Sequence, residues 1–298
     1  MQLINTFIYK ILKLFPKGII KIFSKRYIAG FTFSETLKIC KNLNSKGFSL
    51  TLDILGEHTK TVDEADLITN NYKKLLKSID NHSLDANISI KPTHIGLDIG
   101  ENCYKKNLTA LLKTAKEYSN FVRIDMESSK STDATISSYK ELSKDFSNFG
   151  IVLQAYLFRT HNDIKDINLK NFNFRLCKGI YKESEKIAYQ DRDEINQNYL
   201  KALDYALSND IYIAIATHDE YLLSESYKLI NKHNSKPESF EFQALYGVPL
   251  EKWHKKHFKN NYKIRLYLPF GDDWHKYSLR RIKENPSIAK YVLKNLFK

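Results

Sequence analysis

Cysteine, glycine and long apolar runs are scarce in this chain of 298 residues, and each scarcity excludes a class of protein. Cys40, Cys103 and Cys177 lie far apart, are odd in number and form no C-x-x-C pair. They argue against a disulfide framework or a zinc ribbon and indicate a reducing compartment. No apolar stretch of about 18 residues is present, so no transmembrane helix is expected. The ten glycines are scattered, so the fingerprints of Rossmann and P-loop proteins are missing.

Arginine is also rare: only eight of the 47 basic residues are arginine and the rest are lysine. The net charge of +13 therefore comes mostly from lysine. A lysine-rich surface can attract nucleic acid, anionic lipid or acidic ligands, or it can simply be solvated. The lysines are scattered rather than grouped with aromatic residues, and no nucleic-acid-binding motif is found. We therefore expect no nucleic-acid partner.

The first 26 residues are basic and partly apolar. Lysines interrupt what would have to be the hydrophobic region of a signal peptide, so secretion is not expected. A basic amphipathic segment can lie on a membrane surface, or it can pack against the rest of the fold. The sequence leaves both alternatives open.

Apolar runs recur at a regular interval along the chain, with starts about 23 to 38 residues apart, as expected for βα units. The predicted strands are 49–56, 87–91, 121–126, 150–158, 173–177, 211–217, 240–245 and 264–268. Capping signals open intervening helices at Thr61, with Glu64 three residues later, and at Asp191. The pattern predicts an α/β fold, a (β/α)₈ TIM-type barrel in one domain (1–298) with an N-terminal helical extension (1–48).

Such a barrel carries its chemistry at the C-terminal ends of the strands, and polar residues follow each predicted strand. In chain order they are Glu57, Lys91, Asp125, Glu127, Gln154, Arg175, Lys178, Thr217, His218, Gln243 and Tyr267. Burial of polar groups is costly unless they have partners, and a bound ligand could supply them. Structural pairing is the alternative, with Lys91 neutralising Asp125 and Arg175 neutralising Glu127.

Other patterns are weaker. His254 and His257 have helical spacing, but lysines lie between and beside them, so we expect a solvated helix face and no metal site. A barrel lyase or aldolase is an alternative function, with Lys178 or Lys91 forming a Schiff base and arginines holding a phosphate. This alternative does not explain why Gln154 and His218 accompany the lysines.

Several short pieces carry a resemblance by their order and spacing. They are "LGE" at 55–57, "IDME" at 124–127, "LQAYL" at 153–157, "RLCKGIYKE" at 175–183, "ATHDEYLL" at 216–223, "EFQALYG" at 241–247, "RLYLPFG" at 265–271 and "YSLRRIKENP" at 277–286. The chain resembles the proline dehydrogenase family of FAD-dependent (β/α)₈ enzymes. Ile180 stands where the family usually has a small residue, and Cys177 and Ala244 replace larger apolar residues. These departures leave every polar position intact.

The resemblance implies oxidation of L-proline to Δ1-pyrroline-5-carboxylate, with hydride transfer from proline C5 to flavin N5. It implies that Lys91, Asp125, Arg175 and Tyr267 are catalytic. It implies substrate contacts from Lys91, Asp125, Leu245, Tyr267, Arg280, Arg281 and Glu284. It implies FAD contacts from Gln154, Arg175, Lys178, Gly179, Tyr181, Thr217, His218 and Gln243, with Glu57 just behind the site. Tyr267 further implies proline rather than 4-hydroxyproline, because relatives that prefer the latter tend to have a smaller residue there.

The paired arginines are the notable feature of "YSLRRIKENP", since a planar guanidinium binds a carboxylate better than an ammonium does. Arg280 and Arg281 project about 100° apart on a helix, so both reach one carboxylate only if this last helix lies across the barrel mouth, as the family has it. Glu284 has the spacing to orient either arginine.

The implied partners are a quinone or membrane electron-transfer chain and a separate pyrroline-5-carboxylate dehydrogenase. We expect a cytoplasmic, bacterial protein, with the basic N-terminus as a contact to the inner membrane.

Overall fold

The computed structural model describes residues 21, 24, 26–167, 169–275 and 277–279, and within them eight parallel strands close into a barrel. The strands are β1 (Ser49–Ile54), β2 (Ala86–Ile90), β3 (Val122–Ile124), β4 (Phe149–Gln154), β5 (Asn173–Cys177), β6 (Tyr212–Ala216), β7 (Phe240–Leu245) and β8 (Ile264–Phe270). Each pairs with its sequence neighbour, and β1 pairs with β8 to complete the ring. The predicted (β/α)₈ barrel is confirmed.

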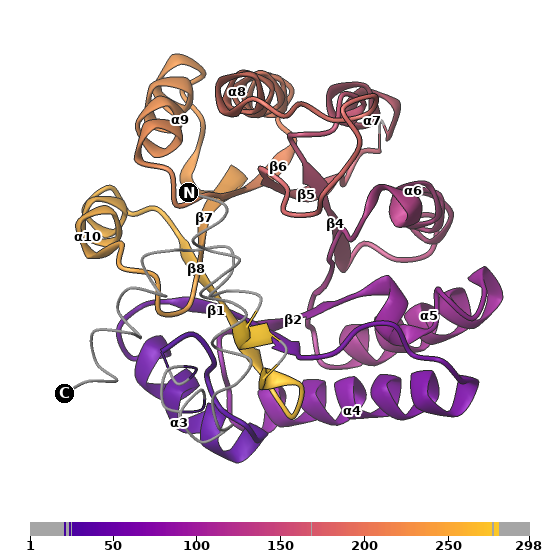
Figure 1. Cartoon of the computed structure of the whole chain (residues 1–298). Coiled ribbons are helices and arrows are strands. Elements are labelled where there is room, and N and C mark those ends of the chain that lie inside the picture. Colours follow the sequence, from indigo (N-terminus) through magenta and orange to yellow (C-terminus); the bar gives the residue numbers. More distant parts are fainter. Residues whose placement is uncertain (1–20, 22–23, 25, 168, 276, 280–298) are drawn as a thin grey trace, which may run out of the picture.

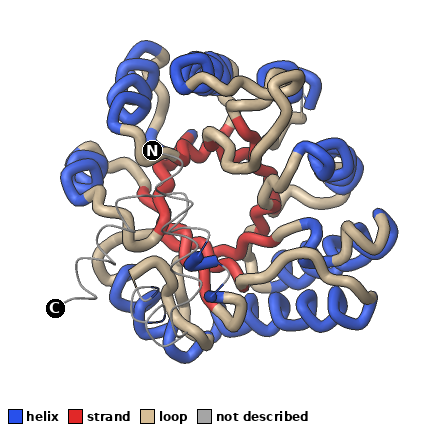
Figure 2. The backbone as a smooth tube through the Cα atoms, viewed as in Figure 1, coloured by secondary structure: helices blue, strands red, loops and turns tan. Residues whose placement is uncertain are grey.

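Helices surround this ring, as Figure 2 shows in blue around the red strands. They are α3 (Phe33–Asn44), α4 (Val62–Asn81), α5 (Glu101–Glu117), α6 (Ser129–Leu142), α7 (Thr160–Ile167), α8 (Arg192–Ser208), α9 (Glu220–Lys232) and α10 (Glu251–Lys259), with 3₁₀ turns η1 (Pro92–Ile95) and η2 (Pro237–Ser239). None of the described helices is both long and apolar enough to span a membrane. The three cysteines are unpaired.

The predicted capping signals begin two of these helices. Thr61 caps α4 in a capping box, because its Oγ1 accepts from Glu64 N at 3.2 Å while Thr61 N donates to Glu64 Oε2 at 3.3 Å. Asp191 caps α8 by accepting from the backbone N of Asp193 and Glu194. A side-chain cap of this kind stabilises a helix by about 1 kcal/mol. These contacts fix where the outer helices begin relative to the strands.

Part of the N-terminal extension packs along the end of β8. Ala29 N donates to Pro269 O at 3.0 Å, and Gly271 N donates to Gly30 O at 3.1 Å. Gly247 (φ +82°) lets the chain pass close by, since a Cβ there would lie 1.8 Å from Arg26 O. Residues 26–30 therefore pack on the barrel, while the predictions for residues 1–20, for the last helix beyond Leu279 and for its arginines lie outside the described residues.

The expectation of a solvated His254–His257 face on α10 is wrong. His257 is 2% exposed, its ring stacks on Phe242 at 3.8 Å between centroids, and Tyr227 Oη lies 2.9 Å from its Nδ1. Burial, together with the nearby charges, lowers the pKa of His257 to about 3, so the ring is neutral. The lysines of α10 are exposed, whereas His257 is a core residue.

Candidate active site

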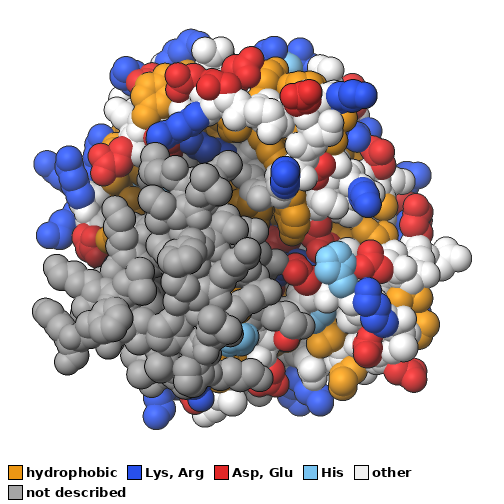
Figure 3. All heavy atoms as spheres, in the orientation of Figure 1, with side chains coloured by type: hydrophobic (Ala, Val, Ile, Leu, Met, Phe, Trp, Pro, Cys, Tyr) orange, Lys and Arg blue, Asp and Glu red, His pale blue; other side chains and the backbone are white. Residues whose placement is uncertain are grey.

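A cavity of about 450 Å³ opens at the C-terminal ends of the strands, within the range of ligand pockets. The surface is hollowed near the centre of this face, with acidic and hydrophobic side chains at the edge (Figure 3). The cavity is lined by most of the predicted site residues: Lys91, Asp125, Glu127, Gln154, Arg175, Lys178, Gly179, Tyr181, Thr217, His218, Gln243, Leu245 and Tyr267. Their positions agree with a site at the barrel mouth, and their individual roles stay predictions.

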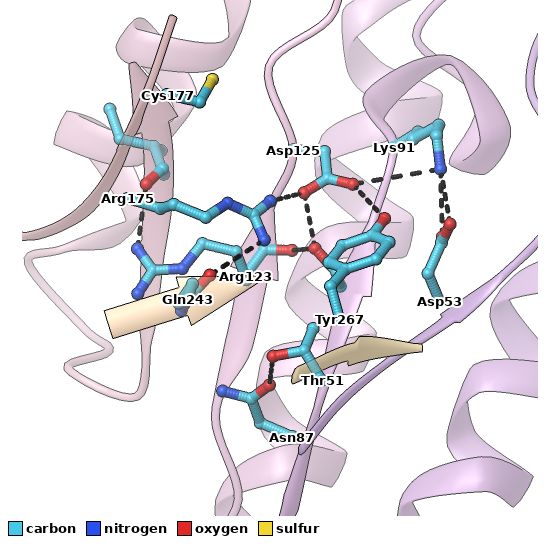
Figure 4. Close-up of polar contacts among 12 residues, drawn as sticks. Thr51, Asp53, Asn87, Lys91, Arg123, Asp125, Arg175, Cys177, Gln243 and Tyr267 are labelled. Atoms are coloured by element: carbon cyan, nitrogen blue, oxygen red, sulfur yellow. Dashed lines mark hydrogen bonds and ion pairs between the residues drawn. The ribbon is translucent and has the colours of Figure 1, made fainter. Parts of the chain in front are cut away.

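Asp125, directly after β3, lies at the centre of the polar contacts in the cavity (Figure 4). Its Oδ1 accepts from Ser89 Oγ at 2.6 Å and pairs with Arg175 Nη2, and its Oδ2 accepts from Tyr267 Oη at 2.7 Å. Burial would raise the pKa of Asp125, but the charges of Arg175 and Lys91 and the two hydroxyl donors lower it below its ordinary value. Asp125 is therefore an anion at neutral pH.

Lys91 follows β2 and reaches the cavity as one half of a buried ion pair. Its Nζ lies 3.0 and 2.9 Å from the two carboxylate oxygens of Asp53 and 3.9 Å from Asp125 Oδ2. Burial would lower the pKa of Lys91, but these two carboxylates raise it, so the amine stays protonated. A protonated amine is not a nucleophile, which disfavours a Schiff base at Lys91.

Arg175 on β5 is held on both sides. Its Nη2 pairs with Asp125, and its Nη1 donates to Gln243 Oε1 at 3.4 Å. The guanidinium also lies 5.2 Å from the centroid of the Tyr267 ring. Gln243 in turn donates to Glu241 at 2.6 Å, in the layer below. Arg175 is only 8% exposed, so it presents a fixed positive charge to the cavity. It pairs with Asp125, so the alternative that Arg175 neutralises Glu127 is not supported.

Tyr267 on β8 is half-buried beside the Asp125 carboxylate. Burial and the charge of Asp125 raise the pKa of Tyr267 well above its ordinary value. Its hydroxyl therefore stays protonated and donates to Asp125, which fixes the ring across the cavity.

A second charged group lies at the rim, where β5 and β6 end. Asp219 accepts from Lys178 Nζ at 2.6 Å and from Arg192 Nη2 at 2.7 Å. Although partial burial acts to raise it, these bonds lower the pKa of Asp219 to about 2. Asp219 N donates to Thr217 Oγ1 at 3.1 Å, and His218 Nε2 accepts from Leu245 N at 3.0 Å. Lys178 is thus paired as well, which also disfavours the lyase alternative.

Three further predicted residues have structural neighbours of their own. Glu127 accepts from the backbone N and Oγ1 of Thr93, at 2.9 and 2.7 Å, so η1 anchors it. Possible ligand atoms of Glu57, His58 and Glu127 all lie within 4.8 Å of one another, which places Glu57 at the edge of the site. Gly179 (φ +109°) passes over Tyr156, where a Cβ would lie 2.3 Å from the ring.

Asp53 and Tyr277 also line the cavity but were not predicted from the sequence. Asp53 lies inside β1, whereas the predicted residue, Glu57, is the polar residue that follows the predicted strand 49–56. A carboxylate within the apolar run "LTLDIL" is the signal that could have found it. Tyr277 packs with Ile28 and Leu55 just ahead of the two arginines, so this part of the chain reaches the barrel mouth.

The fold and the site define a class before any comparison: a (β/α)₈-barrel enzyme whose mouth holds a buried carboxylate between two cations and a tyrosine hydroxyl. A sequence profile described as proline dehydrogenase matches residues 36–294. The chain belongs to the proline dehydrogenase family.

Two relatives show the extent of the similarity. Proline dehydrogenase 1 of Bacillus subtilis (strain 168) is 37% identical over 275 residues, covering 92% of this chain and 91% of the relative. Proline dehydrogenase of Deinococcus radiodurans is 30% identical over 280 residues, covering 92% of this chain and 90% of the relative.

A solved structure extends the comparison to a larger protein. Proline utilization A of Bdellovibrio bacteriovorus, inactivated by N-propargylglycine, matches with a TM-score of 0.81 and 28% identity. The match covers 88% of this chain and 32% of that chain, so this chain spans about a third of the larger protein.

Proposed function

We propose that this chain oxidises L-proline to Δ1-pyrroline-5-carboxylate, with FAD as its cofactor. The observation that carries the proposal is the partly buried cluster of Asp125, Arg175, Tyr267 and Lys91 at the mouth of a proline dehydrogenase family barrel. The cluster offers an anion for the amine of the substrate and fixed cations for negative charge, which are the demands of this reaction.

The residues that line the cavity support binding of a flat, partly polar ring. Val152, Ala216 and Ala244 contribute small apolar side chains to its lining, and they leave space that larger residues would fill. Arg175 supplies positive charge at this wall, and Lys178 supplies it at the rim. These features support binding of an isoalloxazine ring and of the ribityl and phosphate groups beyond it. We assign the ring and its substituents to Gln154, Arg175, Lys178, Gly179, Tyr181, Thr217, His218 and Gln243.

When bound, FAD supplies the acceptor for a hydride from proline C5. The protein groups bind and orient the substrate: Asp125 accepts a hydrogen bond from the proline amine, and the Tyr267 ring, held by its bond to Asp125, covers the proline ring beside Leu245. Arg175 favours the electron-rich product state of the site through its positive charge. Each of these groups is fixed before substrate binds, so little reorganisation is needed.

The carboxylate of proline requires its own cations. From the sequence motif we assign it to Arg280, Arg281 and Lys91, with Glu284 bracing the arginines. By the same family resemblance, the electrons pass to a membrane quinone, and the product passes to a separate pyrroline-5-carboxylate dehydrogenase. The net charge of +13 supports contact with an anionic membrane surface.

The product formed from L-proline tests the proposal. Purified protein given FAD, L-proline and a soluble quinone is expected to form a product that is lighter than proline by two hydrogen atoms. N-propargylglycine, a secondary amine with a carboxylate like proline, is expected to inactivate it, as in the Bdellovibrio relative. Substrate trapped on lysine by borohydride, without an oxidised product, would instead support a lyase.

Tyr267 is expected to decide between proline and 4-hydroxyproline. Tyr267→Ser opens space beside the ring, so the ratio of kcat/KM for 4-hydroxyproline to that for proline should rise at least about tenfold. Tyr267→Phe keeps the ring and loses only the bond to Asp125, so this ratio should stay near the wild-type value while both rates fall. Steady-state kinetics with both substrates measure this, and an unchanged ratio in Tyr267→Ser would exclude Tyr267 as the selecting residue.

A further inference from the structure

Lys91 is bound more closely by Asp53 than by Asp125. Its Nζ lies 3.0 and 2.9 Å from the two oxygens of Asp53, compared with 3.9 Å from the nearest oxygen of Asp125. Asp53 is 1% exposed, projects from β1 into the barrel and lines the cavity. A buried carboxylate bound at this range has a direct effect on the neighbouring ammonium.

The carboxylate of Asp53 is itself held in place from outside the barrel. Tyr72, from α4, is 0% exposed and its hydroxyl lies 3.3 Å from Asp53 Oδ1. The same hydroxyl accepts from Ile54 N at 3.2 Å, which fixes its position against the strand. One layer below, Thr51 Oγ1 on β1 donates to Asn87 Oδ1 on β2 at 2.6 Å, and this polar pair carries no charge.

The groups that face the Asp53–Lys91 pair come from four sides. Asp125 and Glu127 follow β3, Tyr267 comes from β8, Tyr72 from α4 and His94 from η1. The tyrosines and His94 are neutral, since burial raises the pKa of each tyrosine and lowers that of His94 to about 3. Burial raises the pKa of Asp53, but the direct contact with the Lys91 ammonium opposes this rise and favours the charged pair. The charge on Lys91 therefore depends on nearby carboxylates, and Asp53 is the carboxylate in direct contact.

We propose that Asp53 is a positioning residue that keeps the Lys91 ammonium charged and holds it away from Asp125. Asp125 then keeps an oxygen available for the substrate amine, and Lys91 presents its charge to the substrate carboxylate. Without the negative charge of Asp53, nothing holds Lys91 at 3.9 Å from Asp125, and the pKa of Lys91 falls because burial disfavours an ammonium that has lost a counter-ion. The proposal rests on the proposed function, in which Lys91 and Asp125 contact proline.

Asp53→Asn tests this role because asparagine keeps the shape and removes the charge. KM for L-proline is expected to rise about tenfold at neutral pH, a free-energy change of about 1.4 kcal/mol. The rise should grow with pH, and the alkaline limb of the kcat/KM profile should move to lower pH, because the pKa of Lys91 falls when Asp53 no longer raises it. A purely structural role would lower the amount of folded enzyme without moving the pH profile per bound flavin.

A double-mutant cycle shows whether Asp53 acts through Lys91. Asp53→Asn should add little to the effect of Lys91→Met, because the ammonium it controls is already gone. Thr51→Val is the matched control, since it changes a buried polar residue on the same strand one layer lower and should leave the pH profile unchanged. Additive effects, or a wild-type alkaline limb in Asp53→Asn, would overturn the proposal.

Folding and function are kept separate in this test. If Asp53→Asn does not fold, Tyr72→Phe decides, because it removes only the hydroxyl that holds Asp53 and should move the alkaline limb the same way by a smaller amount. A Tyr72→Phe profile that matches the wild type then counts against the proposal. Failure of the proposed function would appear as wild-type protein that does not oxidise proline, which is distinct from any of these outcomes.

Discussion

Replacing Asp125 with asparagine is expected to reduce kcat/KM for L-proline by about two to three orders of magnitude. Asparagine has nearly the same shape but no charge, so Arg175 and Lys91 are left without this counter-ion and the proline amine loses its anionic acceptor. A preorganised group that stabilises charge at a reaction site is typically worth about a hundred- to a thousandfold in rate, or roughly 3–4 kcal/mol of barrier.

Steady-state kinetics per bound flavin give the measurement, so that a loss of cofactor does not count as a loss of chemistry. Asp163→Asn is the matched control, because Asp163 on α7 also pairs with an arginine, Arg159, at 2.8 Å, but does not line the cavity. The control should retain nearly full activity. If Asp125→Asn stays within about threefold of the wild type, Asp125 does not bind the amine.

Arg175→Met is expected to slow reduction of the bound flavin by about a hundredfold or more, a typical loss when one preorganised charge is removed from a reaction site. Methionine is apolar, so it fills space without supplying positive charge to the cavity. The midpoint potential of the flavin should also become more negative, because a positive charge near the reduced, anionic ring is gone.

Rapid mixing with L-proline measures the rate, and a spectroelectrochemical titration measures the potential. Arg123→Met is the control for loss of a buried arginine, since Arg123 is 3% exposed and binds Ile151 O and Asn173 in the layer below the site. Arg123→Met should lower thermal stability but change the midpoint potential and the reduction rate of the flavin little. A wild-type potential in Arg175→Met would show that its charge does not act on the ring.

The position of the site could be predicted from the sequence because of the barrel geometry. In a closed parallel barrel every strand ends at the same face, so polar residues that follow separate strands must meet there. Lys91, Asp125 and Tyr267 are far apart in the sequence and come together for this reason. The capping residues Thr61 and Asp191 could also be predicted from the sequence, because their hydrogen bonds join residues only two or three positions apart.

Asp53 and His257 show where the sequence was not sufficient. Both faces of a barrel strand are buried, so the pattern of apolar and polar residues along β1 does not reveal which side chains face the cavity. Glu57 was therefore predicted at the end of this strand, and Asp53 was not. On α10, the exposed lysines suggested a solvated helix, but His257 is buried and packs on Phe242. Pairings such as Lys91 with Asp53 depend on side-chain geometry in three dimensions.

The visible spectrum of the purified protein during anaerobic addition of L-proline shows whether this chain is a flavin-dependent proline dehydrogenase. We expect bound flavin whose oxidised absorption bands bleach in proportion to added L-proline and return when a quinone is added. Protein that stays colourless after incubation with FAD, or whose flavin L-proline does not bleach, would contradict this expectation.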